Sequence, residues 1–471
     1  MQQNGALEGF SKRWRIVPLT RAWTGLLNTL GINRAVFFTL LNRGWGLLNG
    51  VVTIALVVTY LTAEVQGYYY TFLSLLMMQT LLEFGFGVVL IQFVSHEVAH
   101  LNLDESGKVG GDEVAKQRLA SLIRLALKWY LILSLVFFFG LGVFGSWFLK
   151  PAASGVSVYR PWWILCAGVG ISVFAIPLRC LLEGSNQVYE SQKIALVAGV
   201  MAAGAGWLAI VGGANLYALA IAAVVTGSIS CGLLILRCRS FLGTLNSQRV
   251  ADVVSSISWR REIWPQQWRI GLSWFSGYFM YQSFVPIAFR VQGPIVAGQL
   301  GVALQIYNAN NLIAGAFLTA AGPRMGMLGA KRNYEGLRAL VRKTWLQSTA
   351  TALILSSTIV LSLFLLKWLH LRQFNRFPPL LVVLIFLAVS IMQQLMAVET
   401  TAIRFQKIDP FVSNGILCAV LVLASNILAG VMFGQRGVSL GFAIVILGCA
   451  LPWCHYLYGR ALADMSRYEN R

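Results

Sequence analysis

Two ionisable side chains stand inside long apolar runs near the start of the chain. Arg43 lies in a run that extends over about 35–62, and Glu83 in a second run over about 68–94. Placing a charged side chain at the centre of a bilayer costs about 3 kcal/mol or more, so such residues tend to be paired or functional. We expect Arg43 and Glu83 to pair, either as a purely structural ion pair or with Arg43 also facing an anionic substrate.

Three further cations fall within apolar runs. Arg124 and Lys128 are four residues apart, which places them on one face of a helix, and Arg179 has Glu183 at the same spacing. These side chains either extend to the lipid headgroups or line a cationic vestibule, where guanidinium groups suit a phosphate. The candidate substrate-binding residues are therefore Arg43, Glu83, Arg124, Lys128 and Arg179, and no catalytic residue is proposed.

One motif could hold a metal. His96, Glu97 and His100 form His-Glu-x-x-His, which on a helix can bind zinc in a metalloprotease. The motif stands at the end of an apolar run, where polar residues are ordinary, and the only other histidines are His370 and His455. We therefore predict no metal site and no cofactor.

The composition is that of a membrane protein. Of 471 residues, 57% are hydrophobic and only 11% are charged, and the mean hydropathy is +0.69. The apolar runs do not alternate as the strands of an outer-membrane barrel do, so the predicted fold class is all-α, a polytopic bundle. The net charge of +20 fits cytoplasmic loops rich in Lys and Arg, and nucleic-acid binding is not expected. The seven cysteines form no paired pattern.

Twelve segments are apolar enough to span a membrane. A span needs about 20 apolar residues, and a tight turn at Gly212-Gly213-Ala214-Asn215 must separate the fifth segment from the sixth. The predicted spans lie near 35–62, 68–94, 120–148, 161–183, 194–213, 215–237, 268–291, 294–322, 345–369, 378–402, 411–434 and 437–460.

The loops give an orientation. With the N-terminus inside, the predicted interior segments contain 26 Lys and Arg and the exterior segments contain 7. Because Lys and Arg concentrate on the cytoplasmic side, we predict that both termini are cytoplasmic, which requires an even number of spans. The predicted parts are a basic interfacial segment (1–34), an N-lobe (35–237), a cytoplasmic amphipathic linker (238–267), a C-lobe (268–460) and a cytoplasmic tail (461–471).

Short motifs of glycine, aromatic and polar residues mark the two lobes. They lie at the start, within and at the end of the second predicted span, and near the start and at the end of the eighth. The motifs are Val65-Gln66-Gly67-Tyr68-Tyr69-Tyr70, Leu82-Glu83-Phe84-Gly85-Phe86-Gly87, Gln92-Phe93-Val94-Ser95, Gly298-Gln299-Leu300-Gly301 and Gly322-Pro323-Arg324-Met325.

These motifs resemble those of polysaccharide flippases, the O-antigen branch of the multidrug/oligosaccharidyl-lipid/polysaccharide exporter superfamily. The resemblance implies twelve spans in two six-helix lobes that alternate around a central cavity in the bacterial inner membrane. It also implies a lipid-linked glycan as substrate, for the biosynthesis of a surface polysaccharide such as lipopolysaccharide or exopolysaccharide. The coupling ion, H⁺ or Na⁺, is left open, and other membrane proteins of glycan assembly are candidate partners.

Two alternatives remain open. A multidrug exporter of the same superfamily would share the fold. A cavity that binds cations would be expected to contain acidic side chains, whereas the first predicted span contains Arg43. A membrane-embedded enzyme, such as a glycan polymerase or the zinc protease above, would use catalytic acids in a sizeable outer loop. The predicted outer loops are short, and Glu64 is the only carboxylate in them, so we predict a protein that is not an enzyme.

The predicted orientation can be tested by thiol labelling. Single cysteines at Ala152 and Gln373 should react with an impermeant thiol reagent in intact cells, because both positions lie in predicted outer loops. Cysteines at Asn246 and Arg332, in predicted inner loops, should react only after permeabilisation. The opposite pattern would refute the orientation.

Overall fold

The computed structural model describes residues 34–103, 109–149, 153, 155–246, 258–370, 372–406 and 410–467. The predicted interfacial segment 1–34, apart from its last residue, lies outside this part of the chain. So do residues 247–257 of the predicted linker, which contain its amphipathic stripe, and the last four residues of the predicted tail.

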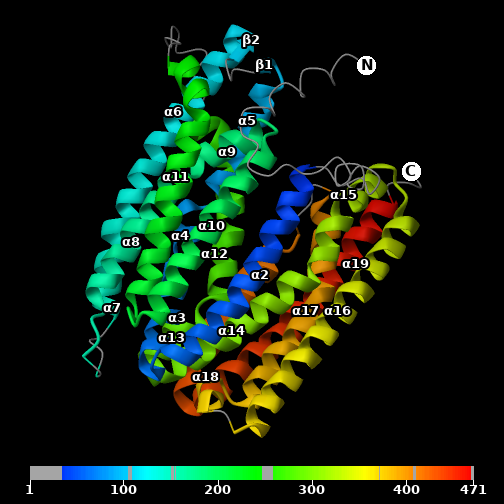
Figure 1. The fold of residues 1–471 in the computed structure, drawn as a ribbon. Coiled ribbons are helices and arrows are strands. Elements are labelled where there is room, and N and C mark those ends of the chain that lie inside the picture. Colours follow the sequence, from blue (N-terminus) through cyan, green and yellow to red (C-terminus); the bar gives the residue numbers. More distant parts are fainter. Residues whose placement is uncertain are drawn as a thin grey trace, which may run out of the picture. The chain divides into compact units, whose positions relative to one another are not determined.

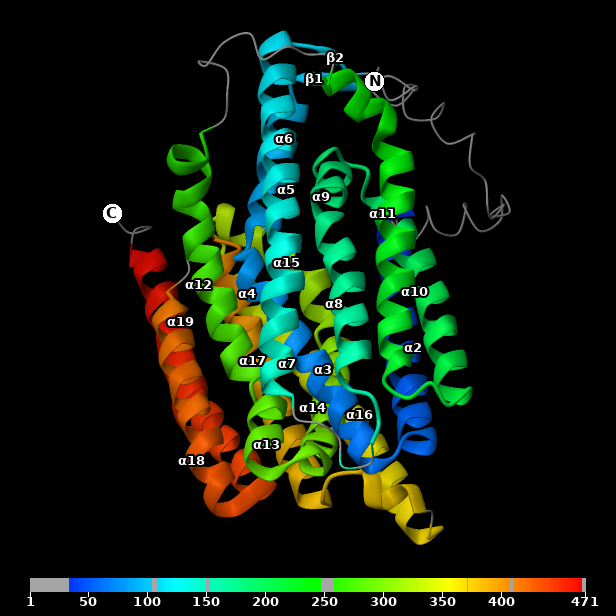
Figure 2. The same cartoon turned by 90° about the vertical axis from the view of Figure 1, so that its left-hand side faces the viewer.

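The described chain is almost entirely helical (Figures 1 and 2). Its contacts form two compact units. Unit 1 comprises residues 1–51, 82–151 and 157–271, and unit 2 comprises residues 52–81, 152–156 and 272–471. The chain passes from one unit to the other within helix α2 (Arg34–Tyr60), at the end of the first hairpin near Leu81, and within helix α12 (Trp264–Tyr281). The predicted lobes 35–237 and 268–460 stay a prediction.

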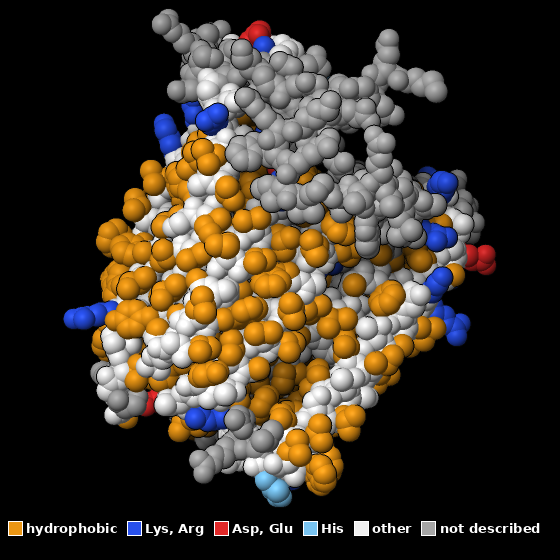
Figure 3. Space-filling view, in the orientation of Figure 1, with side chains coloured by type: hydrophobic (Ala, Val, Ile, Leu, Met, Phe, Trp, Pro, Cys, Tyr) orange, Lys and Arg blue, Asp and Glu red, His pale blue; other side chains and the backbone are white. Residues whose placement is uncertain are grey.

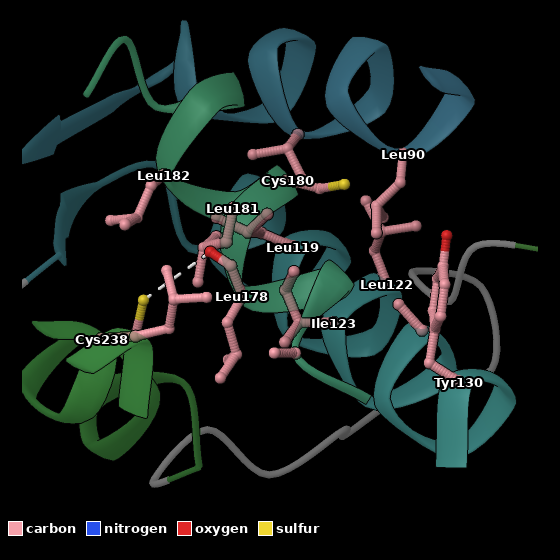
Figure 4. Close-up of a cluster of buried hydrophobic side chains, with 14 of the residues drawn as sticks. Leu90, Leu119, Leu122, Ile123, Tyr130, Leu178, Cys180, Leu181, Leu182 and Cys238 are labelled. Carbon is pink, nitrogen blue, oxygen red and sulfur yellow. Dashed lines mark hydrogen bonds between the residues drawn. The ribbon is translucent and has the colours of Figure 1, made fainter. Parts of the chain in front are cut away.

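Unit 1 is a helical bundle around one apolar core. Leu90, Leu119, Leu122 and Leu181 are each at most 1% exposed in this core, and Figure 4 shows side chains from several helices converging there. Besides the first part of α2, its elements are α5 (Phe86–Val98), α6 (Glu113–Val136), the π-helix η2 (Phe137–Leu141), α7 (Gly142–Phe148), α8 (Tyr159–Phe174), α9 (Ile176–Gly184), α10 (Val188–Val211), α11 (Tyr217–Asn246), the π-helix η4 (Trp259–Ile263), and the strands β1 (Leu101–Leu103) and β2 (Val109–Gly111).

The predicted turn between the fifth and sixth spans is confirmed. Helix α10 ends at Val211 and α11 begins at Tyr217. Gly213 and Asn215 between them have φ angles of 78° and 53°, a left-handed conformation that Gly and Asn adopt most easily. The strands β1 and β2 were not predicted; they form a short antiparallel pair in the loop between α5 and α6.

Unit 2 is also a helical bundle. An apolar cluster in this unit includes Leu337, Val398, Ile403 and Cys454. Its elements are α3 (Ala63–Leu76), the last part of α12, α13 (Phe284–Gln292), α14 (Pro294–Ala314), α15 (Ala316–Ala330), α16 (Tyr334–Trp368), the short helix η5 (Arg372–Arg376), α17 (Leu380–Arg404), α18 (Val412–Val445), the π-helix η6 (Ile446–Ala450) and α19 (Leu451–Arg467). The short helix α4 (Gln79–Glu83) joins the two units.

Helix α18 reverses direction at a glycine. Gly434 has a φ of 60° and a ψ of −146°, far from helical values. The amide of Asn414 donates to the carbonyl of Ala450, and the Cys418 and Cys449 sulfur atoms lie 4.0 Å apart. These pairings join residues on both sides of Gly434, so the chain forms an antiparallel hairpin there. The sequence predicted this break, between 434 and 437.

Two of the glycine motifs meet in unit 2. A Cβ atom on Gly67 of α3 would overlap the backbone carbonyl of Pro294 on α14, and a Cβ on Gly301 would overlap the ring of Tyr70. The side-chain amide of Gln66 also donates to the Gly298 carbonyl over 3.4 Å. Small residues thus let the backbones of α3 and α14 approach closely, as at many helix crossings in membranes.

The fold is that of a multi-pass membrane protein, as predicted. Within the described residues, eight helical runs are long and apolar enough to cross a membrane, or nine if the broken pair Ala63–Glu83 and Phe86–Val98 counts as one span. The run Val412–Met465 counts once although it contains two predicted spans. The predicted spans 268–291 and 294–322 coincide with α12–α13 and α14–α15. The total of twelve crossings stays a prediction.

Hydrophobic side chains cover most of the described surface on the face that Figure 3 shows. Leu131, Leu208, Ile354 and Val431 are examples from four different helices, each about half exposed or more. Lipid chains can cover such apolar surfaces without a free-energy penalty, whereas exposing the same surfaces to water would be unfavourable. The exposed apolar surface therefore fits a membrane environment.

We predict that Gly67→Ala destabilises the protein by about 1–3 kcal/mol, because the added methyl group overlaps backbone and cannot be relieved by a rotamer change. Gly277→Ala is the matched control, since a Cβ on this helical glycine meets no heavy atom within 4 Å. Thermal unfolding of the detergent-purified variants measures the difference. Equal melting temperatures for the two variants would contradict the close crossing of α3 and α14.

Candidate functional site

The second predicted span is broken at Phe84 and Gly85. Phe84 has a φ of 52° and Gly85 one of 73°, so α4 ends and α5 starts anew at Phe86. The first turn of a helix exposes backbone N–H groups that need acceptors. Oε1 of Glu83 accepts a hydrogen bond from the backbone N–H of Gly87 over 3.2 Å. The carboxylate of Glu83 therefore caps the new helix.

Tyr130 of α6 binds the same carboxylate oxygen of Glu83. Its hydroxyl donates to Glu83 Oε1 over 2.9 Å, and the Tyr130 side chain is fully buried. A Cβ on Gly87 would lie 2.5 Å from Glu83 Oε1 and 3.3 Å from the Tyr130 oxygen. Gly87 is therefore needed for this arrangement.

The predicted pairing of Glu83 with Arg43 is not what the structure shows. The hydrogen-bond partners of the carboxylate are Tyr130 and the Gly87 N–H, and the cation whose charge acts on it is Arg179 of α9. Arg43 lies half-buried on α2, where its neighbour Asn42 donates to Gln192 of α10 over 3.0 Å. Sequence spacing along two helices allowed the Arg43–Glu83 pair, but it did not indicate the packing of α6 and α9 that supplies other partners.

The residues at the break, Phe84 and Gly85, pack on the start of α12, within unit 1. The rings of Phe84 and Trp264 stack with centroids 6.3 Å apart. A Cβ on Gly271 would overlap the Phe84 ring, and one on Gly85 would overlap Ile270. The break is thus fixed by tight packing as well as by the Glu83 cap.

The predicted cations of unit 1 lie at a similar level. Counted from Phe148 at the predicted outer end of α7, Lys128 lies about 30 Å and Arg124 about 36 Å along the helix. Counted from Tyr159, Arg179 lies about 30 Å along α8 and α9. The hydrocarbon core is about 30 Å thick, so the predicted orientation would put these side chains near the cytoplasmic phosphates.

The cations do not form one cluster with Glu83. Tyr130 points to Glu83, and Lys128 is about 200° away from Tyr130 around α6. Lys128 and Arg179 are exposed, and Arg124 is half-buried. Tyr130 therefore lies on the face of α6 toward Glu83, and Lys128 lies on the opposite face.

The His-Glu-x-x-His motif has another role. Oε1 of Glu97 accepts from the Arg118 Nε over 2.9 Å, and Arg118 also donates to Glu262 of η4 over 3.0 Å. The rings of His96 and His100 are 6.3 Å apart. No group of three His, Cys, Asp or Glu that could hold a metal occurs within the part of the chain that the structure describes. Arg118 thus links α6 to Glu97 of α5 and to Glu262 of η4.

A polar network crosses the interior of unit 2, and sequence reasoning did not identify it as a unit. The amide of Asn310 on α14 donates to the hydroxyls of Ser356 and Ser390, each over 3.1 Å. Asn311 accepts from Ser390 and from Gln394 over 3.0 and 2.8 Å. These side chains satisfy one another, so most of their hydrogen-bonding capacity holds helices together. One buried oxygen, Oδ1 of Asn310, has no hydrogen-bond partner among the protein atoms.

Glu399 is a second intramembrane carboxylate, which sequence reasoning did not select. Its Oε1 lies 2.6 Å from Nδ1 of His455, and its buried Oε2 has no hydrogen-bond partner in the protein. The Glu399 side chain is 3% exposed and that of His455 is 65% exposed. The signal was the same as for Glu83, an acid within an apolar run, and it could have been found in the same way.

Comparison with known proteins gives a fold and no sequence relative. No family model matches the chain, and no curated protein matches it. Among solved structures, it resembles the inward-facing conformation of a multidrug resistance MATE family transporter of the MOP superfamily, with a TM-score of 0.64 and 14% identity over 89% of this chain and 95% of that one.

Two other solved structures extend this likeness. The lipid II flippase MurJ in an inward closed conformation gives a TM-score of 0.56 and 12% identity over 92% of this chain and 89% of that one. A MOP superfamily transporter from Pyrococcus furiosus, described by the reverse polarity of its binding pocket, gives 0.52 and 15% over 91% and 94%. The chain therefore has the all-helical membrane fold that MATE transporters and MurJ share.

The cap at the helix break predicts a difference between two substitutions. Glu83→Ala leaves the Gly87 N–H and the Tyr130 hydroxyl without an acceptor, which should cost about 1–3 kcal/mol of stability. Glu83→Gln keeps an acceptor oxygen and should retain most of the stability. Melting temperatures of purified variants measure both effects, with Glu335→Ala as an exposed control. If the Gln and Ala variants were equally destabilised, the cap would not be the role of this side chain.

Proposed function

We propose that the protein is a bacterial inner-membrane flippase that moves a lipid-linked oligosaccharide or polysaccharide precursor to the outer leaflet by alternating access. Its fold is shared with transporters, among them a lipid II flippase, and its motifs resemble those of polysaccharide flippases. No covalent chemistry is part of the proposal, since the substrate is moved unchanged.

The observation that supports an anionic substrate most is the balance of charge in unit 1. The carboxylates within its apolar helices are engaged by the protein: Glu83 caps α5, and Glu183 accepts from Ser191 over 2.7 Å. Arg179 and Lys128, by contrast, are exposed near the cytoplasmic boundary. Surplus positive charge at this level attracts phosphate groups, and guanidinium binds phosphate with favourable geometry.

In the proposed cycle, the cations act before and during translocation. Arg43 and Arg179 would bind the phosphate that links glycan to lipid, and Arg124 and Lys128 would gather such lipids from the cytoplasmic leaflet. Glu83 would act through structure, because its carboxylate fixes the break at Phe84 and Gly85.

A multidrug exporter is the second candidate, and two observations favour it. The MATE transporter gives a higher TM-score than MurJ. Glu399 offers a buried carboxylate oxygen without a hydrogen-bond partner in the protein, and a carboxylate with His455 beside it suits a proton or an organic cation. In a flippase, the same pair would be a candidate site for a coupling proton.

Transport by purified protein in proteoliposomes tests the proposal. A fluorescent lipid-linked oligosaccharide diphosphate should cross the bilayer faster with the protein than without it. Arg179→Gln should slow this movement about tenfold, the effect of losing one charge-assisted contact to the phosphate. Arg332→Gln, in an exposed loop, is the matched control and should move the substrate at the original rate.

The multidrug alternative is tested in the same vesicles with a fluorescent lipophilic cation. Transport of this cation that depends on Glu399, together with no movement of the glycolipid, would overturn the flippase proposal. Movement of the glycolipid without transport of the cation would support it.

A further inference from the structure

An apolar groove lies on the surface of unit 1, between α6 and α8. Its volume is about 330 Å³, near the lower end of the range of small-molecule sites. Figures 1 and 2 both show these two helices side by side. Ser134, Leu135, Phe138, Ala167, Gly170, Ile171 and Phe174 line the groove.

The lining combines small residues with large apolar ones. The hydroxyl of Ser134 donates to the Gly170 carbonyl over 2.8 Å, so this polar atom is already satisfied. Leu135 and Ile171 are exposed. The groove thus presents hydrocarbon to its contents, and in a membrane the contents are hydrocarbon chains.

Two aromatic rings pack together on the side of the groove toward the predicted outer end of the helices. The ring of Phe138 packs edge-on against that of Trp163, with centroids 5.2 Å apart. Trp163 lies one turn of α8 beyond Ala167 toward the outer end. The helix α6 also changes to a π-helix at Phe137, a local bulge of the kind that often occurs at functional sites.

Two cationic side chains lie on the predicted cytoplasmic side of the groove, on the same face of α6 as Leu135. Lys128 and Arg124 lie about 20° on either side of Leu135 around α6. Ser134 and Phe138 lie about 9 and 15 Å beyond Lys128 along the helix, within the inner half of the hydrocarbon core. A lipid of the cytoplasmic leaflet with its phosphate at Lys128 and Arg124 would therefore have its chain at the level of the groove.

We propose that the groove binds the hydrocarbon chain of a single-chain lipid phosphate, with Arg124 and Lys128 at the phosphate. This lipid is the carrier half of the glycolipid substrate, so the inference rests on the proposed function and names the place where the substrate is first held. A single furrow between two helices, with cations at its cytoplasmic end, matches one chain and one phosphate. A phospholipid would leave its second chain outside the furrow.

Photocrosslinking tests this site. The full-length protein in neutral phosphatidylcholine nanodiscs is exposed to hexadecyl phosphate that carries a diazirine on its chain. Crosslinks should concentrate in the two peptides that contain Leu135 and Ile171. Arg124→Gln and Lys128→Gln should each weaken labelling about tenfold, as expected for losing one charge-assisted contact. Ala167→Phe, which fills the groove, should abolish it.

Controls separate this site from ordinary lipid contact. Met201→Phe adds the same bulk to an exposed apolar position on α10 and should leave labelling unchanged, and gel filtration confirms that each variant remains folded. Unlabelled hexadecyl phosphate should compete, whereas phosphatidylglycerol and hexadecanol should not. Equal competition by phosphatidylglycerol would overturn the proposal in favour of a bulk lipid site, and labelling spread evenly over all exposed apolar helices would overturn it as well.

The test is independent of transport. If hexadecyl phosphate labels the groove but the glycolipid does not move in proteoliposomes, the lipid site stands and the flippase proposal fails. If the glycolipid moves and the groove is not labelled, the flippase proposal stands and the lipid site at the groove is refuted. If Ala167→Phe abolishes labelling and also slows movement of the glycolipid, the groove lies on the transport route.

Discussion

The hydrogen bonds that Glu83 makes at the break of the second span are the constraint on which the arrangement of unit 1 depends. A helix that stops and restarts within a membrane leaves backbone N–H groups without water to bind them. Glu83 supplies an acceptor to Gly87, and Tyr130 of α6 holds the same carboxylate oxygen. One boundary between the two units, at Leu81 and Leu82, lies a few residues before this break in the sequence.

The partners of Glu83 bear on the electrostatics of unit 1. Its hydrogen bonds come from two neutral groups, the Tyr130 hydroxyl and the Gly87 N–H, and not from an arginine or a lysine. Arg179 and Lys128 are exposed, at a level that the predicted orientation puts near the cytoplasmic phosphates. In the proposed function, Arg179 would contact the substrate phosphate, and Arg124 and Lys128 would lie on the cytoplasmic side of the apolar groove between α6 and α8. Both arrangements suit a lipid that carries a phosphate.

The helical segments and several turns could be predicted from the sequence, because hydrophobic runs and glycine-rich breaks are local signals. The turns at Gly213 and Gly434 occur where the sequence places them. Partners across the fold could not be predicted in this way. Tyr130 is one aromatic residue among many in an apolar run, and nothing local distinguishes it as the partner of Glu83. Arg43 was a plausible partner by depth alone, but depth does not specify which faces of two helices meet.

Polar networks illustrate the same limit. Asn310, Ser356 and Ser390 lie on three helices, and each residue alone looks like an ordinary polar group within a span. Only their packing makes them one network.

The proposed function depends on the recognition of a charged phosphate. Its most direct test compares two substrates in proteoliposomes that contain the wild-type protein. One is a lipid-linked glycan with its phosphate, and the other is a neutral analogue of the same chain and sugars. Faster movement of the phosphate-bearing lipid is the predicted result, and equal rates for both lipids would contradict the account.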